Sequence, residues 1–271
     1  MTNTKIEWCD STWNPITGCR HGCPYCYAKD IANRFATRKG YELVEPETYC
    51  VTAQDGSKLY EMNKQAYFFN EDDFDRYPCA YPHKFEPTLH RYRMDEYKDK
   101  KKSRNIFVGS MTDIFAEYIP ERWRREVFNA CKAGGQHNYL FLTKNPAKYH
   151  ELAKCASLPD GDHFWYGSST PTPNTEYFFD ATRRYHTFLS VEPMLENFAE
   201  VGENVILPEW IIIGAETGNR KEKVLPSRAW IEYLVNLCRE RSIPVFMKSS
   251  LKEIWGVELL QEFPKALIHE K

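Results

Sequence analysis

The sequence predicts an α/β protein with parallel strands, specifically a partial (β/α)6-type barrel. Short strands that are apolar throughout recur along the chain, helical patterns lie between several of them, and polar residues follow them. The 271 residues, 42% hydrophobic and 27% charged, suffice for one globular domain spanning 1–271. A doubly wound open sheet is the alternative, because it has the same alternation.

Six strands are predicted where short apolar runs end in small or polar residues. A run without polar alternation is typical of a strand covered on both faces. A seventh strand is expected near residues 14–17, ahead of a cluster of cysteines. The six runs span residues 106–108, 139–142, 164–166, 187–189, 210–213 and 245–247.

Three helices are predicted between these strands. The first carries an apolar face over residues 28–35, with Gly40 just beyond as a stop signal. The second opens at Pro120 and closes before Gly134. The third begins after Ser227, a good N-cap residue.

Residues 41–104 break the alternation, which predicts an insertion after the first β/α unit. The segment is rich in Tyr and Phe, holds an acidic stretch at 70–75 and has a basic end at 98–104. One interpretation is a cover that helps to bind substrate. The other is a structural elaboration with a solvated charge run.

Charge and cysteine usage limit the class of protein. The net charge of −2 gives no global attraction to nucleic acid or anionic lipid. The beginning of the chain has no apolar signal segment, and no run is long enough to span a membrane, so a cytoplasmic protein without a membrane partner is expected. Nine cysteines in such a protein favour metal or redox chemistry over disulfides.

Polar residues follow the strands, at the edge where ligands bind in both candidate architectures. For any single one, a helix cap or a turn remains an equally good interpretation. Their recurrence is the stronger signal. They are Ser110, Thr112, Asp113, Thr143, Lys144, Ser168, Ser169, Glu192, Glu216 and Lys248.

Three cysteines form the main candidate site. Cys19, Cys23 and Cys26 have the spacing Cys-x3-Cys-x2-Cys. Thiolates ligate iron–sulfur clusters, and three of them leave one iron of a [4Fe–4S] cluster open to a small molecule. Structural zinc is the alternative, with His21 or Cys9 as fourth ligand, but no second cysteine or histidine pair accompanies the motif.

The cysteine motif, with Tyr25 before the last cysteine, resembles the signature of the radical S-adenosylmethionine superfamily. With four further motifs, the chain is similar to a phage-associated family within it that has no settled substrate. The resemblance covers most of the chain except much of 41–104. The motifs span residues 6–26, 107–115, 142–144, 190–193 and 214–218.

The resemblance implies an enzyme in which the cluster cleaves S-adenosylmethionine. The open iron would chelate the methionyl group, and one electron from a reductant such as flavodoxin or ferredoxin would generate a 5′-deoxyadenosyl radical. That radical would abstract hydrogen from an unidentified substrate, with a nucleic-acid base as the leading candidate.

The resemblance also implies roles for individual residues. Cys19, Cys23 and Cys26 would ligate iron, and Tyr25 would pack near the adenine. Residues 109–113 follow the second strand, where the superfamily often has Gly-Gly-Glu to hold the methionyl amine. The expected cofactor-binding residues are Tyr25, Gly109, Ser110, Thr112, Asp113, Lys144, Ser168 (ribose), Glu192 and Glu216, with Lys248 as a further candidate.

Two other functions fit the same residues. A non-catalytic nucleic-acid-binding protein, stapled by zinc or an iron–sulfur cluster, would use aromatic and basic residues such as 90–93. The second is a barrel protein that keeps the cluster but has lost catalytic turnover. The mild net charge and the polar residues after the strands count against the nucleic-acid-binding protein, whereas the sequence leaves the barrel without turnover open.

Overall fold

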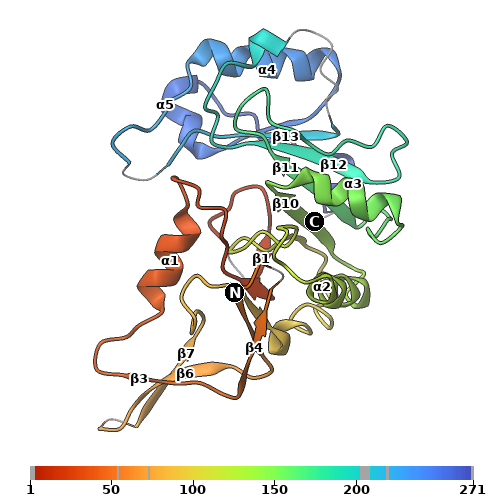
Figure 1. The fold of residues 1–271 in the computed structure, drawn as a ribbon. Helices are drawn as coiled ribbons and strands as arrows, with labels where there is room; N and C mark the ends of the chain where they lie inside the picture. Colours follow the sequence, from red (N-terminus) through yellow and green to blue (C-terminus); the bar gives the residue numbers. More distant parts are fainter. Residues whose placement is uncertain (1–3, 54, 73, 202–207, 218–219, 270–271) are drawn as a thin grey trace. The chain divides into compact units, whose positions relative to one another are not determined.

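The computed structural model describes residues 4–53, 55–72, 74–201, 208–217 and 220–269. The chain forms two compact units (Figure 1). Unit 1 comprises Met1–Thr12, Lys102–Phe107 and Gln136–Lys271, and unit 2 comprises Trp13–Lys101 and Val108–Gly135. Among the described residues, no helix has the length and apolar character needed to cross a membrane.

The main sheet has seven strands, in the order β1-β9-β10-β11-β12-β13-β14. From β10 to β14 each strand pairs in parallel with the next one along the chain. The α/β class and the parallel sheet are therefore confirmed, in a form compatible with a partial barrel. The strands are β1 (Ser11–Trp13), β9 (Asn105–Val108), β10 (Asn138–Thr143), β11 (Phe164–Ser169), β12 (His186–Val191), β13 (Trp210–Ile213) and β14 (Val245–Met247).

The three predicted helices, at 28–35, after Pro120 and after Ser227, are present, but the connections do not form a full sixfold repeat. No helix joins β11 to β12, where residues 170–185 include two prolines among turn-forming residues. The described part of the β12–β13 connection holds only the 3₁₀ turn η2 (Phe198–Val201). The helices are α1 (Tyr27–Phe35), α2 (Glu121–Ala133), α3 (Pro146–Lys154), α4 (Arg228–Glu240) and α5 (Lys252–Trp255).

The core of unit 1 has two parts. Aromatic rings pack on one face of the sheet, and aliphatic side chains pack beneath α4. Trp8 contacts Phe107, with ring centroids 4.7 Å apart, and packs with Phe188 and Trp210. The hydroxyl of Ser227 accepts a hydrogen bond from the backbone N–H of Trp230, so the predicted cap of α4 is confirmed.

Residues 41–104 supply most of the strands of two small sheets in unit 2. One sheet has the order β2-β8-β5-β4, and the other has the order β3-β6-β7. A short 3₁₀ helix, η1 (Arg91–Arg93), follows β8. The strands are β2 (Ile16–Thr17), β3 (Glu42–Val44), β4 (Thr48–Thr52), β5 (Lys58–Met62), β6 (Ala66–Asn70), β7 (Asp75–Cys79) and β8 (Thr88–His90).

The strand expected at residues 14–17 is wrong as a strand of the main sheet. The main-sheet strand β1 ends at Trp13, and Ile16 and Thr17 instead pair antiparallel with β8. Pro15 lies between the two pieces and offers no N–H for a continuous ladder. The chain therefore enters the cysteine motif from a small sheet built largely by residues 41–104.

Candidate functional site

The three predicted cluster ligands lie on one short segment between β2 and α1, which we call the cysteine loop (residues 18–26). Cys19, Cys23 and Cys26 are half-buried, and none forms a disulfide. The backbone N–H of Cys26 donates to the carbonyl oxygen of Cys23 at 3.2 Å, and Cys26 is the N-cap residue of α1. Tyr25 is half-buried within the same turn. Cys23 and Cys26 thus lie at the two ends of one turn, and Cys19 precedes this turn in the same loop.

Gly18 fixes the beginning of the cysteine loop against its neighbours. Its N–H donates to the carbonyl oxygen of Met111 at 2.9 Å, and the N–H of Cys19 donates to that of Phe85 at 3.2 Å. Gly18 has a φ of +87°, and a Cβ there would lie 2.2 Å from the carbonyl oxygen of Glu86. Only glycine fits this close approach without displacing the backbone.

Arg20 and Tyr118 hold the next part of the loop. The Arg20 guanidinium donates to the Glu86 carboxylate at 2.8 Å and to the carbonyl oxygen of Lys58 at 2.6 Å. The Tyr118 hydroxyl accepts from the N–H of Arg20 at 2.8 Å and donates to the Cys19 sulfur at 3.5 Å. Burial raises the pKa of the Cys19 thiol, against the lowering effect of the Tyr118 hydrogen bond. Metal binding at Cys19 would therefore release a proton.

Residues 109–113, the predicted amine-binding segment, contact the cysteine loop directly. The Thr112 hydroxyl donates to the carbonyl oxygen of Gly18 at 2.6 Å, and the Ser110 hydroxyl bonds to the Asn14 side chain. Gly109 is buried, has a φ of +84° and turns the chain after β9. These contacts explain why a polar segment follows this strand.

Asp113 joins this segment to the cysteine loop through a partner that sequence reasoning missed. Its Oδ2 lies 2.8 Å from Nε2 of His21, and its Oδ1 accepts the N–H of Phe115 at 3.0 Å. The Asp113 side chain is buried. The sequence suggested His21 only as a zinc ligand, and nothing local links it to a residue 92 positions away.

The other predicted cofactor residues lie in unit 1, at the carboxyl-terminal ends of its strands. The ammonium group of Lys144 donates to the hydroxyl of Ser169 at 2.9 Å. Glu192 and Lys248 form an ion pair beside Gly214, where a Cβ would lie 3.0 Å from the Glu192 side chain. The strand-end polarity predicted from sequence is therefore present in three dimensions.

Glu216 and Ser168 are both buried and already have hydrogen-bond partners within the protein. Arg220 binds Glu216 with two hydrogen bonds of 2.6 Å and holds the pKa of that carboxyl below its usual range. The hydroxyl of Ser168 is fully buried inside β11 and accepts the N–H of Phe178 at 2.9 Å, so it already has a structural role. Gly218, at the end of the fifth sequence motif, lies outside the described residues.

The donor chemistry of the cysteine loop fits an iron–sulfur cluster better than zinc. Among the residues that the structure describes, no three His, Cys, Asp or Glu side chains already converge as a metal site. The loop offers three thiols, as a cluster with one open iron requires, whereas closed zinc requires a fourth protein ligand. His21, the nearest candidate, is bonded to Asp113.

Comparisons with known proteins give a family without an assigned activity. No curated protein and no solved structure matches the chain. A family model described as a protein of unknown function, DUF5131, matches residues 3–259. The match takes in the cysteine loop, residues 109–113 and the polar strand ends of unit 1. Because it covers nearly the whole chain, this chain belongs to the DUF5131 family.

Proposed function

We propose that this protein is a radical S-adenosylmethionine enzyme whose [4Fe–4S] cluster is held by Cys19, Cys23 and Cys26. The observation that carries the proposal is the presence of three half-buried thiols, none in a disulfide, within the eight residues from Cys19 to Cys26. The substrate remains to be identified, with a nucleic-acid base as the leading candidate. When bound, such a cluster supplies the single electron that cleaves S-adenosylmethionine.

The surroundings of the cysteine loop support this proposal. A cluster site needs a loop whose backbone is held while its thiols stay available. Gly18, Cys19 and Arg20 are held by hydrogen bonds of their backbone N–H groups, and these bonds do not use the thiol sulfurs. The half-burial of the three cysteines also restricts the access of water to a reactive site.

We assign cofactor binding to the polar residues of 109–113 and to the polar residues at the strand ends of unit 1. Asp113, with Ser110 and Thr112, would hold the methionyl amine, because a buried carboxylate is the natural partner of an ammonium group. Tyr25 would contact the adenine. The methionyl carboxylate and the ribose hydroxyls would be bound by Lys144, Glu192, Glu216 and Lys248. A flavodoxin or ferredoxin would deliver the electron.

The cofactor assignment predicts a measurable result for Asp113. Anaerobically reconstituted, reduced protein should release 5′-deoxyadenosine, and Asp113→Ala should weaken S-adenosylmethionine binding about tenfold or more. A hydrogen bond to a charged group contributes about 1.5–3 kcal/mol, which sets this magnitude. Calorimetric titration and chromatography of the nucleoside are the measurements.

His21→Ala is the matched control, because it removes the loop's bond to Asp113 but keeps the carboxylate. We expect its cofactor affinity to stay within about threefold of wild type. Equal weakening in both variants would mean that Asp113 acts only by positioning the loop. Failure of the wild type to release 5′-deoxyadenosine would contradict the enzyme proposal itself.

A further inference from the structure

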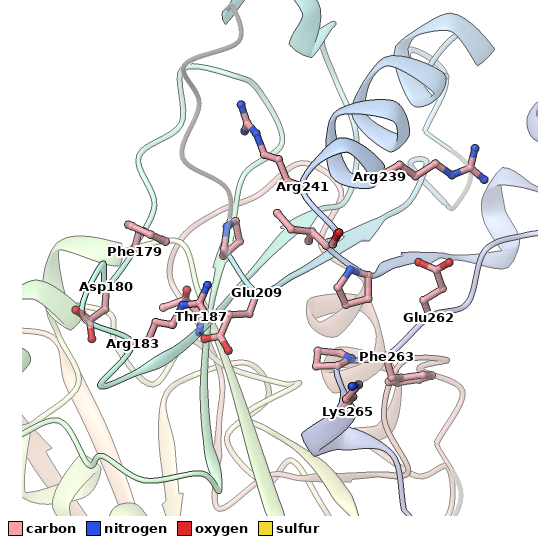
Figure 2. Close-up of a pocket in the computed structure, with 15 residues that line it drawn as sticks. Phe179, Asp180, Arg183, Thr187, Glu209, Arg239, Arg241, Glu262, Phe263 and Lys265 are labelled. Carbon is pink, nitrogen blue, oxygen red and sulfur yellow. Dashed lines mark hydrogen bonds between the residues drawn. The ribbon is translucent and has the colours of Figure 1, made fainter.

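A cavity lies in unit 1, away from the polar strand ends described above. It has a volume of about 900 Å³ and is bordered by Thr187 near the start of β12, Glu209 just before β13 and Pro244 just before β14 (Figure 2). It therefore opens at the amino-terminal ends of these strands, whereas Glu192 and Lys248 lie at their carboxyl-terminal ends. Its size is that of a small-molecule site.

Four cationic side chains line this cavity: Arg183, Arg239, Arg241 and Lys265. Among the described residues, Arg183, Arg239 and Lys265 make no ion pair, although the neighbouring Arg184 pairs with Asp160 at 2.9 Å. Figure 2 shows Arg239 and Arg241 extending in different directions from the end of α4, with Arg183 across the cavity. The positive charges are spread around the cavity rather than gathered on one point.

The acidic residues of the cavity accept hydrogen bonds from the protein itself. Glu209 accepts hydrogen bonds from Nδ1 of His186 at 2.9 Å and from the N–H of Thr187 at 3.3 Å. Glu262 accepts the N–H of Val245 at 3.0 Å, and Asp180 accepts that of Tyr185 at 3.0 Å. These bonds occupy carboxylate oxygens, whereas Arg183, Arg239 and Lys265 make no ion pair within the described part of the chain and can meet a ligand.

The cavity also offers an apolar surface. The half-buried ring of Phe263 lines it, held from behind by Trp210 and Phe246 at centroid distances of 5.4 and 5.2 Å. Prolines 208, 244 and 264 line it as well. A ligand that matches both surfaces carries several negative charges and a flat apolar group, which is the chemistry of a nucleotide.

We propose that this cavity binds nucleotide units, with phosphates on Arg183, Arg239 and Lys265 and the base against Phe263. Separated cations suit several phosphates better than one inorganic phosphate. The ligand is either a free nucleoside triphosphate or part of a single-stranded nucleic acid. The site needs no cluster and stands apart from the radical chemistry proposed above.

The test is a binding titration of the full-length protein with two probes, a nucleoside triphosphate and an oligothymidylate of about twelve nucleotides, at about 50 and 200 mM salt. The charge-reversal variant R183E/R239E should bind at least about tenfold more weakly than wild type. Both arginines are exposed and make no ion pair with any residue that the structure describes, so the fold should persist. R239E/K265E serves as a second variant if the first one unfolds at a lower temperature.

The control variant K154E/K252E makes the same change in net charge with exposed lysines of α3 and α5 outside the cavity. It should bind as wild type does. Preference for the triphosphate would identify a free nucleotide, and preference for the oligonucleotide would identify a strand. Absence of saturable binding of both probes at low salt, or equal weakening in the control, would overturn the proposal.

Discussion

Gly18→Ala should abolish retention of the iron–sulfur cluster. The new Cβ would lie 2.2 Å from the carbonyl oxygen of Glu86 and 2.7 Å from that of Phe85. Both are backbone atoms that cannot rotate away, and a φ of +87° is itself unfavourable for alanine. Cys19 follows directly, so the first thiol must shift with the backbone. Iron content after anaerobic reconstitution measures the effect, and we expect less than about a tenth of the wild-type iron.

Gly22→Ala is the matched control for this substitution. Gly22 also has a positive φ, +68°, and lies in the same loop, but a Cβ there would meet no atom within 4 Å. The control therefore carries the cost of an unfavourable φ, about 1 kcal/mol, without the collision. It should retain most of the iron. Equal iron in the two variants would show that the close approach at Gly18 is not required.

Glu61→Ala should produce the largest loss of stability in unit 2. The Glu61 carboxylate is 4% exposed and accepts hydrogen bonds from Trp123 Nε1 at 2.6 Å, from Arg91 at 2.7 Å and from Arg122. Its removal leaves a buried indole N–H and two guanidinium groups without their shared acceptor. We expect the free energy of unfolding to fall by about 2–4 kcal/mol, since both arginines remain part-exposed.

Glu126→Ala is the control, because Glu126 is more exposed and pairs only with Arg91, at 2.8 Å, within this network. It should lower the free energy of unfolding by less than about 1 kcal/mol. Urea denaturation followed by tryptophan fluorescence compares the variants. Similar losses in the two variants would contradict a central role for Glu61.

The same network predicts a pH dependence. Burial alone would raise the pKa of Glu61, but the hydrogen bonds from Arg122, Trp123 and Arg91 outweigh it and lower that pKa. A lowered folded-state pKa contributes stability above the unfolded value of 4.5, and this stability is lost as the pH falls through the folded value. The Glu61→Gln variant lacks this titration. It should therefore lose less stability than wild type when the pH is lowered from 4.5 through the folded-state pKa of Glu61.

The sequence predicted the parts of the fold that depend on local pattern. The runs at 210–213 and 245–247 coincide with β13 and β14, because a buried parallel strand is apolar at each position. Helix α3 was missed, since its buried side includes Lys148 and its apolar face is short. The strands of residues 41–104 were also missed, because several are exposed on most positions, as in β7.

The candidate site could be predicted only for residues that lie close together in the sequence. The spacing of the cysteines was visible in sequence, and so was the polarity of residues 109–113. The partners of the loop were not, because Tyr118 meets Cys19 across 99 positions and Asp113 meets His21 across 92. Such contacts arise from tertiary packing, which has no periodic signal in one sequence.

The central claim is that Cys19, Cys23 and Cys26 hold a [4Fe–4S] cluster with one iron open to S-adenosylmethionine. The most direct measurement counts iron and sulfide after anaerobic reconstitution and records the electron paramagnetic resonance spectrum of the reduced protein. Wild type should hold about four irons and four sulfides, and adding S-adenosylmethionine should change its spectrum. The control C50A/C155A removes two exposed cysteines outside the loop and should hold the same iron and sulfide as wild type. The variant C19A/C23A/C26A should hold no cluster. One tightly bound zinc without sulfide, or a cluster retained by the triple variant, would contradict the claim.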